Sequence, residues 1–291
     1  MKLAIKVDVD TYRGTLEGVP RLAELLTKHN ADATFLFSLG PDHTGRALRR
    51  IFRPGFFSKV KRTSVVGNYG VRTLLYGTLL PGPDIGAGCA SILQRVAAAR
   101  FETGAHCWDH VRWQDFAARR DADWTEREMA RALERYRKVF GRAARTWGAA
   151  GWQTSRHAAW VQERTCDYAS DTRGRGPFRP VWDGVAIGCP QIPTTLPTLD
   201  EILGVHHDVV LHLLKITDAP ADHVYTAHAE LEGGRLLPLF ERLLLAWQAQ
   251  GYELVSTRAI YESLDVSTLP KCEVIFGKVP GRSGTLATQG D

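Results

Sequence analysis

Residues 2–14 constrain the fold most, because they read as a buried strand that ends in two carboxylates (KLAIKVDVDTYRG). Apolar residues alternate along this stretch, and the strand period of two places Asp8 and Asp10 on one side. Paired acids at a strand end are costly unless a metal, a proton or a substrate group lies between them. The stretch therefore predicts either a functional site at the carboxyl end of a strand or a solvated turn, where Asp is common.

The length and composition of the chain set limits on the fold. With 291 residues, 44% of them hydrophobic, the chain can bury one barrel-sized core. Its Lys and Arg residues outnumber its Asp and Glu residues by five, which favours an anionic partner. The five cysteines are odd in number and form no C-x-x-C pair, so neither a disulfide framework nor a zinc ribbon is indicated.

The first residues lack the apolar segment of a signal peptide and run directly into the strand that carries Asp8. We therefore expect a cytoplasmic protein. No uncharged apolar run reaches the roughly 18 residues that a membrane-spanning helix needs. The nearest candidate, residues 74–93, contains Pro81, Pro83 and Asp84. A location on the surface of a membrane remains compatible with the sequence.

Residues 43–83 contain eight Lys or Arg and no Asp or Glu, with aromatic and aliphatic residues between them. This mixture is typical of a peripheral membrane surface, where cations contact anionic head groups and aromatic rings lie at the interface. No nucleic-acid partner is expected, because the apolar content exceeds what phosphate binding needs and no recognition helix is indicated. A folded subdomain with a solvated basic face remains an alternative. The predicted membrane contacts are Arg49, Arg50, Phe56, Phe57, Lys59, Lys61 and Arg62.

The rest of the chain alternates between short apolar strands and amphipathic helices, of which residues 124–140 are the clearest. Polar side chains recur where predicted strands end. The residues in question, besides the two acids of the first strand, are His106, His110, Asp171 and His228. Because the carboxyl ends of parallel strands carry the active site of a (β/α) barrel, this layout predicts an α/β barrel enzyme.

His106 and His110 are separated by three residues and can face one metal ion on a helical turn or in a tight loop. Such pairs also occur by chance. The position of this pair after a short strand strengthens the hypothesis of a metal site. Residues 148–152 are small except for the last, Trp152, and allow the backbone to approach a ligand closely.

Together these motifs resemble those of the NodB-type polysaccharide deacetylases. The resemblance implies a distorted (β/α) barrel over residues 1–265. The basic and aromatic insert after the second strand, residues 43–88, lies outside the resemblance, and we expect it to face a membrane because of its composition. The resemblance also implies that Asp8 is the general base and His228 the general acid, with Asp171 orienting or tuning His228. The implied ligands of one divalent transition metal (Zn, Mn, Co or Ni) are Asp10, His106 and His110. Separately, the Gly- and Ser-rich residues 277–291 predict a disordered tail.

The chain departs from the usual family pattern at two places. The adjacent Asp-Asp pair is here Asp8-Val9-Asp10, and the arginine-proline motif is replaced by residues 149–152 (AAGW), which leaves no obvious arginine to hold the base. With the insert and the segment His228-Ala229-Glu230, these departures are most similar to the undecaprenyl-phosphate 4-deoxy-4-formamido-L-arabinose deformylases of lipid A modification.

That similarity implies metal-dependent hydrolysis of the formamide of a polyprenyl-phosphate-linked sugar, giving formate and a free amine. It also implies peripheral attachment to the anionic inner face of the inner membrane and a role in resistance to cationic antimicrobial peptides such as polymyxin. The expected substrate contacts are Gly151, Trp152 and Glu230, with a backbone N–H near Gly151 or Trp152 for the oxyanion.

Other functions remain open. An N-deacetylase of another amino sugar would use the same core residues. A phosphatase of the haloacid-dehalogenase type fits the Asp8-Val9-Asp10-Thr11 segment, with Asp8 as nucleophile and Mg²⁺ as metal, but leaves the histidines without a role. A membrane-binding module without catalysis would explain the insert alone.

Overall fold

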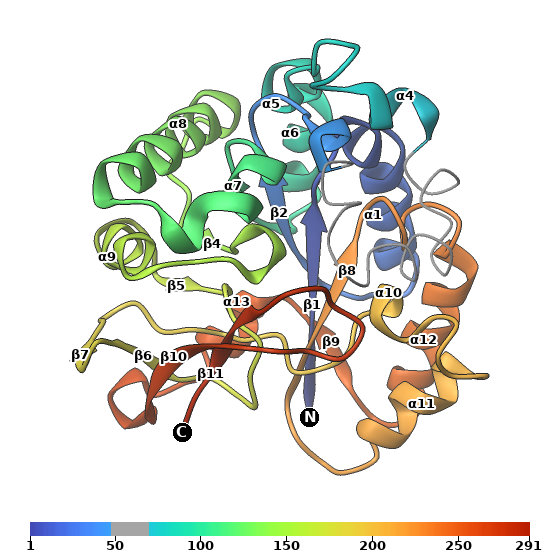
Figure 1. The fold of residues 1–291 in the computed structure, drawn as a ribbon. Helices are drawn as coiled ribbons and strands as arrows, with labels where there is room; N and C mark the ends of the chain where they lie inside the picture. The colour runs from blue at the N-terminus through green and yellow to red at the C-terminus, as the bar shows by residue number, and fades with distance from the viewer. Residues whose placement is uncertain (48–69) are drawn as a thin grey trace.

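Strand β1 (Lys2–Val9) lies at the centre of a seven-stranded parallel sheet in the computed structural model, which describes residues 1–47 and 70–291. The strand order is β5-β4-β3-β2-β1-β8, and β9 also pairs with β1. β8 pairs with β1 along residues 3–8, whereas β2 pairs with residues 6–9 and β9 with residues 2–4. Figure 1 shows β1 in the middle of the molecule with helices around the sheet. The structure confirms the predicted α/β barrel, which is open between β5 and β8.

The other strands of this sheet are β2 (Thr34–Ser38), β3 (Glu102–Cys107), β4 (Thr146–Trp147), β5 (Tyr168–Ala169), β8 (His223–His228) and β9 (Glu253–Val255). The longer helices are α1 (Val19–Lys28), α6 (Ala90–Ala98), α7 (His110–Phe116), α8 (Ala122–Phe140), α9 (Arg156–Thr165), α11 (Val209–Ile216) and α12 (Leu237–Ala249). Short helical segments are η1 (Gly14–Gly18), α4 (Val71–Leu75), α5 (Ile85–Gly88), η3 (Ala117–Arg119), η4 (Ala150–Trp152), α10 (Leu199–Ile202), α13 (Thr257–Tyr261) and η5 (Val266–Thr268).

The two faces of β1 have different surroundings. Leu3, Ile5, Val7 and Val9 belong to the large hydrophobic core between the sheet and its helices. Ala4 points the other way, into a smaller cluster within the barrel, and the period of two places the side chains of residues 6, 8 and 10 on that same inner side. The predicted alternation is confirmed, and it directs charged side chains into the barrel.

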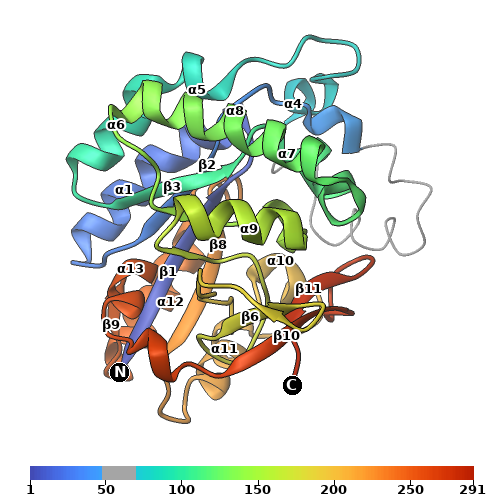
Figure 2. The same cartoon turned by 90° about the vertical axis from the view of Figure 1, so that its left-hand side faces the viewer.

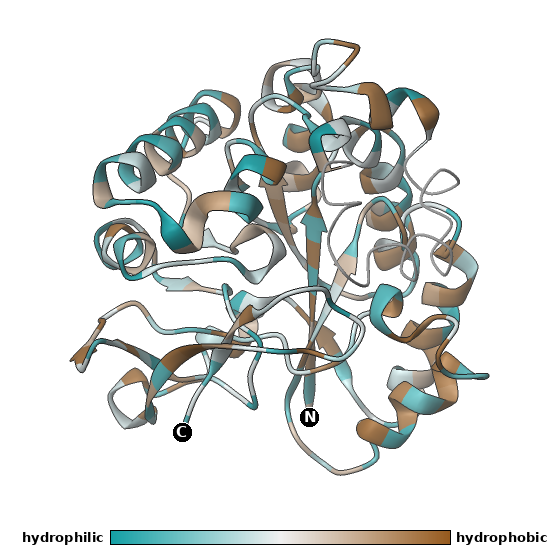
Figure 3. Ribbon diagram, in the orientation of Figure 1, coloured by the Kyte–Doolittle hydropathy of each residue, from teal (hydrophilic) through white to brown (hydrophobic). Residues whose placement is uncertain are grey.

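Helix α8 shows how the outer layer is built. Its buried side chains, which include Met129, Ala132 and Tyr136, recur at helical spacing on one face. Asp121 caps its first turn by accepting a hydrogen bond from the N–H of Trp124 (2.9 Å), and Gly141 ends it in the left-handed conformation. Much of the helix is hydrophilic in Figure 3, as expected for a layer with one face in solvent.

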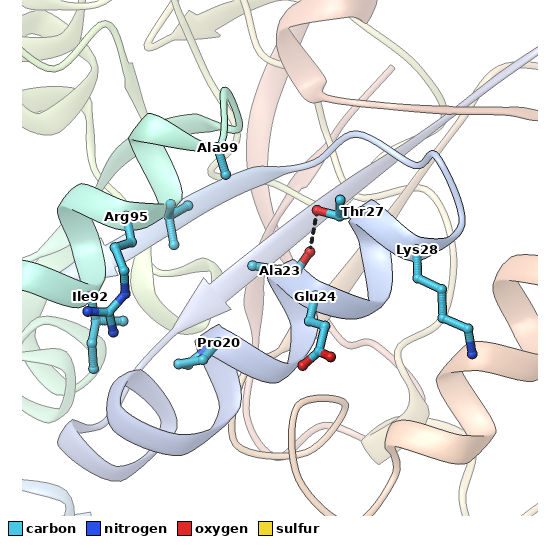
Figure 4. A pocket seen from close by; sticks show the side chains of 9 residues that line it. Pro20, Ala23, Glu24, Thr27, Lys28, Ile92, Arg95 and Ala99 are labelled. Carbon is cyan, nitrogen blue, oxygen red and sulfur yellow. Dashed lines mark hydrogen bonds between the residues drawn. The ribbon is translucent and has the colours of Figure 1, made fainter.

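Between α1 and α6 the outer layer has an open groove of about 510 Å³ (Figure 4). Its lining comes from these two helices and the turn after α6, and includes Pro20, Ala23, Ile92 and Arg95. No strand-end residue takes part, so the groove is separate from the predicted site.

The prediction that residues 277–291 form a disordered tail is wrong. Strand β11 (Leu286–Gln289) pairs antiparallel with β10 (Lys271–Gly277), and β10 joins β6 (Arg179–Trp182) and β7 (Val185–Ala186) in a second sheet (Figure 2). In the connection between β10 and β11, Arg282 forms ion pairs with Asp200 (2.9 Å) and Glu201 (2.7 Å). These contacts come from α10, about 80 positions earlier, so local composition could not reveal them.

The predicted insert, residues 43–88, is described only in part. All seven predicted membrane contacts, residues 49–62, lie outside the described residues. The part that the structure describes includes α4 and α5. Within the described ranges, no helix combines the length and apolar character needed to cross a bilayer.

We predict that Arg282→Ala lowers the free energy of unfolding by ~3 kcal/mol, because it leaves two buried carboxylates without one of their cations. Urea unfolding at pH 7 measures the effect. The control is Arg175→Ala, since Arg175 forms an exposed ion pair with Asp291 (3.8 Å) and should contribute less than about 1 kcal/mol. Equal stability of parent and Arg282→Ala would contradict an ordered, anchored tail.

Candidate active site

The inner face of β1 delivers both acids of the first motif to the carboxyl edge of the sheet. Asp8 is the strand partner of His228 at the end of β8, and Asp10 follows two positions later. Both acids are buried, with 2% and 9% of their surface exposed. Burial at this depth excludes the solvated turn that the sequence alone left open.

The His-x-x-x-His motif spans the end of β3 and the start of α7. His106 is the last but one residue of the buried strand, and His110 is the first residue of the helix. Asp109 caps α7 by accepting a hydrogen bond from the N–H of Arg112 (3.0 Å), and its other oxygen contacts His43 Nδ1 (2.6 Å). The cap fixes where the helix begins, and so fixes the direction of His110.

Asp10, His106 and His110 form the one group of three possible metal ligands in the described part of the chain, with ligand atoms within 4.8 Å of one another. Each imidazole Nε2 lies 3.3 Å from a carboxylate oxygen of Asp10. His106 Nδ1 lies 2.6 Å from the carbonyl oxygen of Gly148, which can only accept, so Nδ1 carries the proton and Nε2 is left to bind. The donor set of two imidazoles and one carboxylate therefore fits a divalent transition metal.

The opposite charges of the carboxylates and the imidazoles each stabilise the ionised form of the other. Burial alone would raise the pKa of Asp10, but His110 and His106 hold it well below its usual range. Burial alone would lower the pKa of His106, but the neighbouring carboxylates Asp8 and Asp10 raise it. Asp10 is thus ionised at neutral pH and attracts a cation into the site.

His228 ends β8, beside Asp8 of β1. Its backbone N–H donates to Glu232 (2.8 Å), and its ring meets the ring of Trp152 edge-on at 6.2 Å. Its Nδ1 is buried and has no hydrogen-bond partner among the described residues. The charge of His228 also helps to lower the pKa of Asp10, after the larger effects of His110 and His106.

Asp171 does not take the predicted role beside His228. Its Oδ2 accepts hydrogen bonds from Gln162 (2.7 Å) and Thr154 (3.1 Å), and the structure gives no bond between Asp171 and His228. Burial raises its pKa to about 6, against the opposing effect of these donors. The sequence placed Asp171 correctly at a strand end but could not identify partners from α9 and the preceding loop.

Glu230, predicted to contact substrate, instead holds the backbone that presents Asp10. Its Oε1 accepts hydrogen bonds from the N–H groups of Asp10 (3.0 Å) and Thr11 (2.7 Å) and from the Thr11 hydroxyl (2.8 Å). Burial, with the charge of Asp10, raises its pKa well above the usual value. Oε1 of Glu230 therefore positions the backbone of a proposed metal ligand, and a contact between Glu230 and the substrate stays a prediction.

Gly151 and Trp152 form η4 with left-handed backbone angles (φ of 61° and 52°). The N–H of Trp152 donates to the carbonyl of Ala149 (3.0 Å), so it is not available to an oxyanion. The Trp152 ring is buried and lies between three cations, Lys6, Arg173 and Arg282, at 4.7–5.4 Å. Sequence reasoning missed these cations; the one available signal was a charged residue at an inward position of a buried strand.

An open parallel barrel with an Asp-His-His group at its strand ends is the polysaccharide deacetylase fold, and comparison with solved structures supports this class. A protein from Mycobacterium smegmatis described as a polysaccharide deacetylase has a TM-score of 0.62 at 14% identity, covering 96% of this chain and 94% of that one. A family 4 acetyl xylan esterase from Clostridium thermocellum, solved in complex with cobalt, has a TM-score of 0.51 at 12% identity, covering 90% and 91%.

Similarity to curated proteins identifies a family within the polysaccharide deacetylase class. No family model matches the sequence. A protein of Shewanella sediminis (strain HAW-EB3) is 34% identical over 293 residues, which covers 99% of this chain and 94% of the relative. A protein of Wigglesworthia glossinidia brevipalpis is 29% identical over 282 residues, covering 95% and 98%. Both are designated "probable 4-deoxy-4-formamido-L-arabinose-phosphoundecaprenol deformylase ArnD". The chain belongs to this deformylase family.

We predict that Asp171→Asn removes a pH dependence of stability. The folded pKa of about 6 lies above the ordinary 3.8, so the folded state holds this proton more tightly and the parent loses stability as the pH rises from 4 to 7. Relative to Asp171→Asn, the parent should lose ~2 kcal/mol between pH 4.5 and pH 7.5. Urea unfolding of both proteins at pH 4.5 and 7.5 measures it, with the exposed Asp218→Asn as control. A pH-independent difference would contradict the burial argument.

Proposed function

We propose that this chain is a metal-dependent deformylase that hydrolyses the formamide of undecaprenyl-phosphate-linked 4-deoxy-4-formamido-L-arabinose to formate and the free amine. The observation that carries the proposal is the convergence of Asp10, His106 and His110 beside Asp8 and His228. The full-length similarity to relatives designated as deformylases of this substrate supports it.

Asp10, His106 and His110 would hold one divalent transition metal, such as Zn²⁺, Mn²⁺, Co²⁺ or Ni²⁺. When bound, the metal supplies Lewis-acid polarisation of the formyl carbonyl and lowers the pKa of the attacking water. Oδ1 of Asp10, which is buried and accepts no hydrogen bond from the described residues, is one acceptor that such a cation would satisfy.

Asp8 accepts the proton of the water that attacks the formyl carbon. Its Oδ1 is buried and has no hydrogen-bond partner in residues 1–47 and 70–291, so one oxygen is left for that proton. His228, at the end of the neighbouring strand, donates a proton to the departing sugar nitrogen. The N–H of Gly151 is the remaining candidate donor to the oxyanion, since that of Trp152 is engaged. An Asp-nucleophile phosphatase would leave the convergent histidines without a role.

A hollow of about 230 Å³, lined in part by the Glu230 that binds the N–H of Asp10, is the candidate site for the phosphate of the substrate. Three arginines line it, namely Arg13, Arg21 and Arg235, together with Glu17, Glu230 and several glycines. Arginine is suited to phosphate because its guanidinium donates two parallel hydrogen bonds. η1, which carries part of the rim of this hollow, begins four residues after Asp10, so the hollow adjoins the proposed chemistry.

The same rim exposes apolar side chains that would meet a lipid surface. Leu16 of η1, Val71 of α4 and Leu79 are 48%, 64% and 80% exposed. Gly70, at the start of α4, lies against the guanidinium of Arg13, so the two segments adjoin. Cations and apolar residues on one rim support peripheral binding to the anionic inner face of the inner membrane. The amine product is cationic, which supports a role in lipid A modification and resistance to cationic peptides such as polymyxin.

We predict that the purified chain binds one divalent metal and releases formate from the lipid-linked formamido sugar, and that His106→Ala loses both. The reason is that His106 supplies a buried ligand whose other nitrogen is fixed by Gly148. Metal analysis and formate quantification test this. The control, His157→Ala, removes a histidine that packs on Trp160 and should leave both unchanged. Formate release that survives in His106→Ala would exclude the proposed metal site.

We predict that Arg21→Glu raises KM for the lipid-linked substrate about tenfold, since it reverses a charge in the phosphate hollow, and leaves kcat nearly unchanged. Steady-state kinetics in detergent micelles measure both. Arg95→Glu is the matched control, because Arg95 is an exposed helical arginine in the groove between α1 and α6. A soluble formamido sugar without phosphate should not distinguish Arg21→Glu from the parent; if it does, the phosphate assignment is wrong.

A further inference from the structure

Lys6 is a charged side chain in an unusual place. It lies in the middle of β1, is 0% exposed, and is among the largest fully buried side chains of the described residues. Its strand partners are Thr34 and Thr226 on the two neighbouring strands, so no edge of the sheet offers it a route to solvent. An ammonium group at this depth costs several kcal/mol unless other groups compensate it.

Three groups surround the ammonium of Lys6. Nζ lies 3.5 Å from Asp8 Oδ2, donates a hydrogen bond to the carbonyl oxygen of Ser170 (3.1 Å), and lies 5.4 Å from the centre of the Trp152 ring. The Ser170 carbonyl belongs to the segment after β5, which is fixed by a bond from the Ser170 hydroxyl to Ile192 (2.6 Å). The ammonium is therefore held from two sides, and its remaining strong partner is the carboxylate of Asp8.

The two oxygens of Asp8 differ as a result. Oδ2 faces Lys6, whereas Oδ1 is buried and has no hydrogen-bond partner in the part of the chain that the structure describes. A carboxylate with one oxygen held and one free can rotate less than one with both free, and its free oxygen keeps a defined direction. Because residues 6 and 8 lie two apart on one strand, the rigid backbone of β1 sets the spacing between the cation and the acid.

Asp171 is the other acid that Lys6 affects, since its charge helps to lower the pKa of Asp171. That carboxylate, however, is already bonded to Gln162 and Thr154. Asp8 is therefore the acid that depends on Lys6 for a close charged partner.

We infer that Lys6 is a positioning residue that fixes the carboxylate of Asp8 for proton abstraction, an inference that rests on the function proposed above. Lys6 itself does not touch substrate; it acts through Asp8 and sets the direction of the free oxygen. The free energy spent on burying the Lys6 ammonium is thus offset in function, because the ammonium keeps the free oxygen of Asp8 directed into the site.

The test is Lys6→Met in the metal-loaded full chain, assayed with the lipid-linked formamido sugar. We expect kcat to fall roughly 10- to 100-fold, as for a misplaced catalytic group, with KM and the content of divalent metal within about twofold of the parent. Lys6→Arg, which restores the cation, should recover part of the loss. The matched control is Lys2→Met on the same strand, since Lys2 Nζ bonds only to the Ala259 carbonyl (3.1 Å) far from the site.

A double substitution separates positioning from general damage. In Asp8→Asn, adding Lys6→Met should cause no further loss of kcat, because the group that Lys6 positions is already gone. Lys6→Gln replaces Lys6→Met if the latter fails to fold, since it keeps a donor for Ser170 without the charge. An unchanged kcat in the single variant, or independent losses in the double variant, overturns the inference. A parent that releases no formate overturns the proposed function and this role with it.

Discussion

The site depends on charges that a single strand carries into a dry interior. The inner face of β1 presents Lys6, Asp8 and Asp10 in succession, and each would be costly to bury alone. The structure compensates each one differently: a cation for Asp8, two imidazoles for Asp10, and a carbonyl with an aromatic face for Lys6. The remaining features of the site follow from the need to bring these partners to one place.

The compensating groups come from distant parts of the chain. Glu230, 220 positions from Asp10, binds the backbone at the end of β1, and Ser170 reaches Lys6 from the segment after β5. Gly148, after β4, fixes the ring of His106. A parallel barrel makes this possible because its strands all end at the same edge. The order β5-β4-β3-β2-β1-β8 places the relevant ends around one space.

The sequence predicted the parts of this arrangement that have a local pattern. The strand period placed Asp8 and Asp10 on one side of the strand. The three residues between His106 and His110 indicated that both bind one metal ion, and the alternation of strands and helices indicated the barrel. Hydrogen-bond and ion-pair partners that only tertiary contacts bring together could not be predicted from the sequence. Asp171 was assigned to the wrong neighbour, and the ordered tail was missed because its anchors lie on α10. The lysine at position 6 was visible but had no local feature to link it to Asp8.

The depth of the catalytic groups and the exposure of the rim are linked by the proposed substrate. A lipid-linked sugar has its phosphate near the bilayer and its formamide at the far side of the ring, so an enzyme needs cations at a surface and buried acids just behind it. The segment from Asp10 to η1 meets this geometry within a few residues, since Asp10 is buried and Leu16 is half-exposed. One short connection after β1 therefore joins the proposed membrane face to the proposed metal site, and changes in it would affect both binding and catalysis.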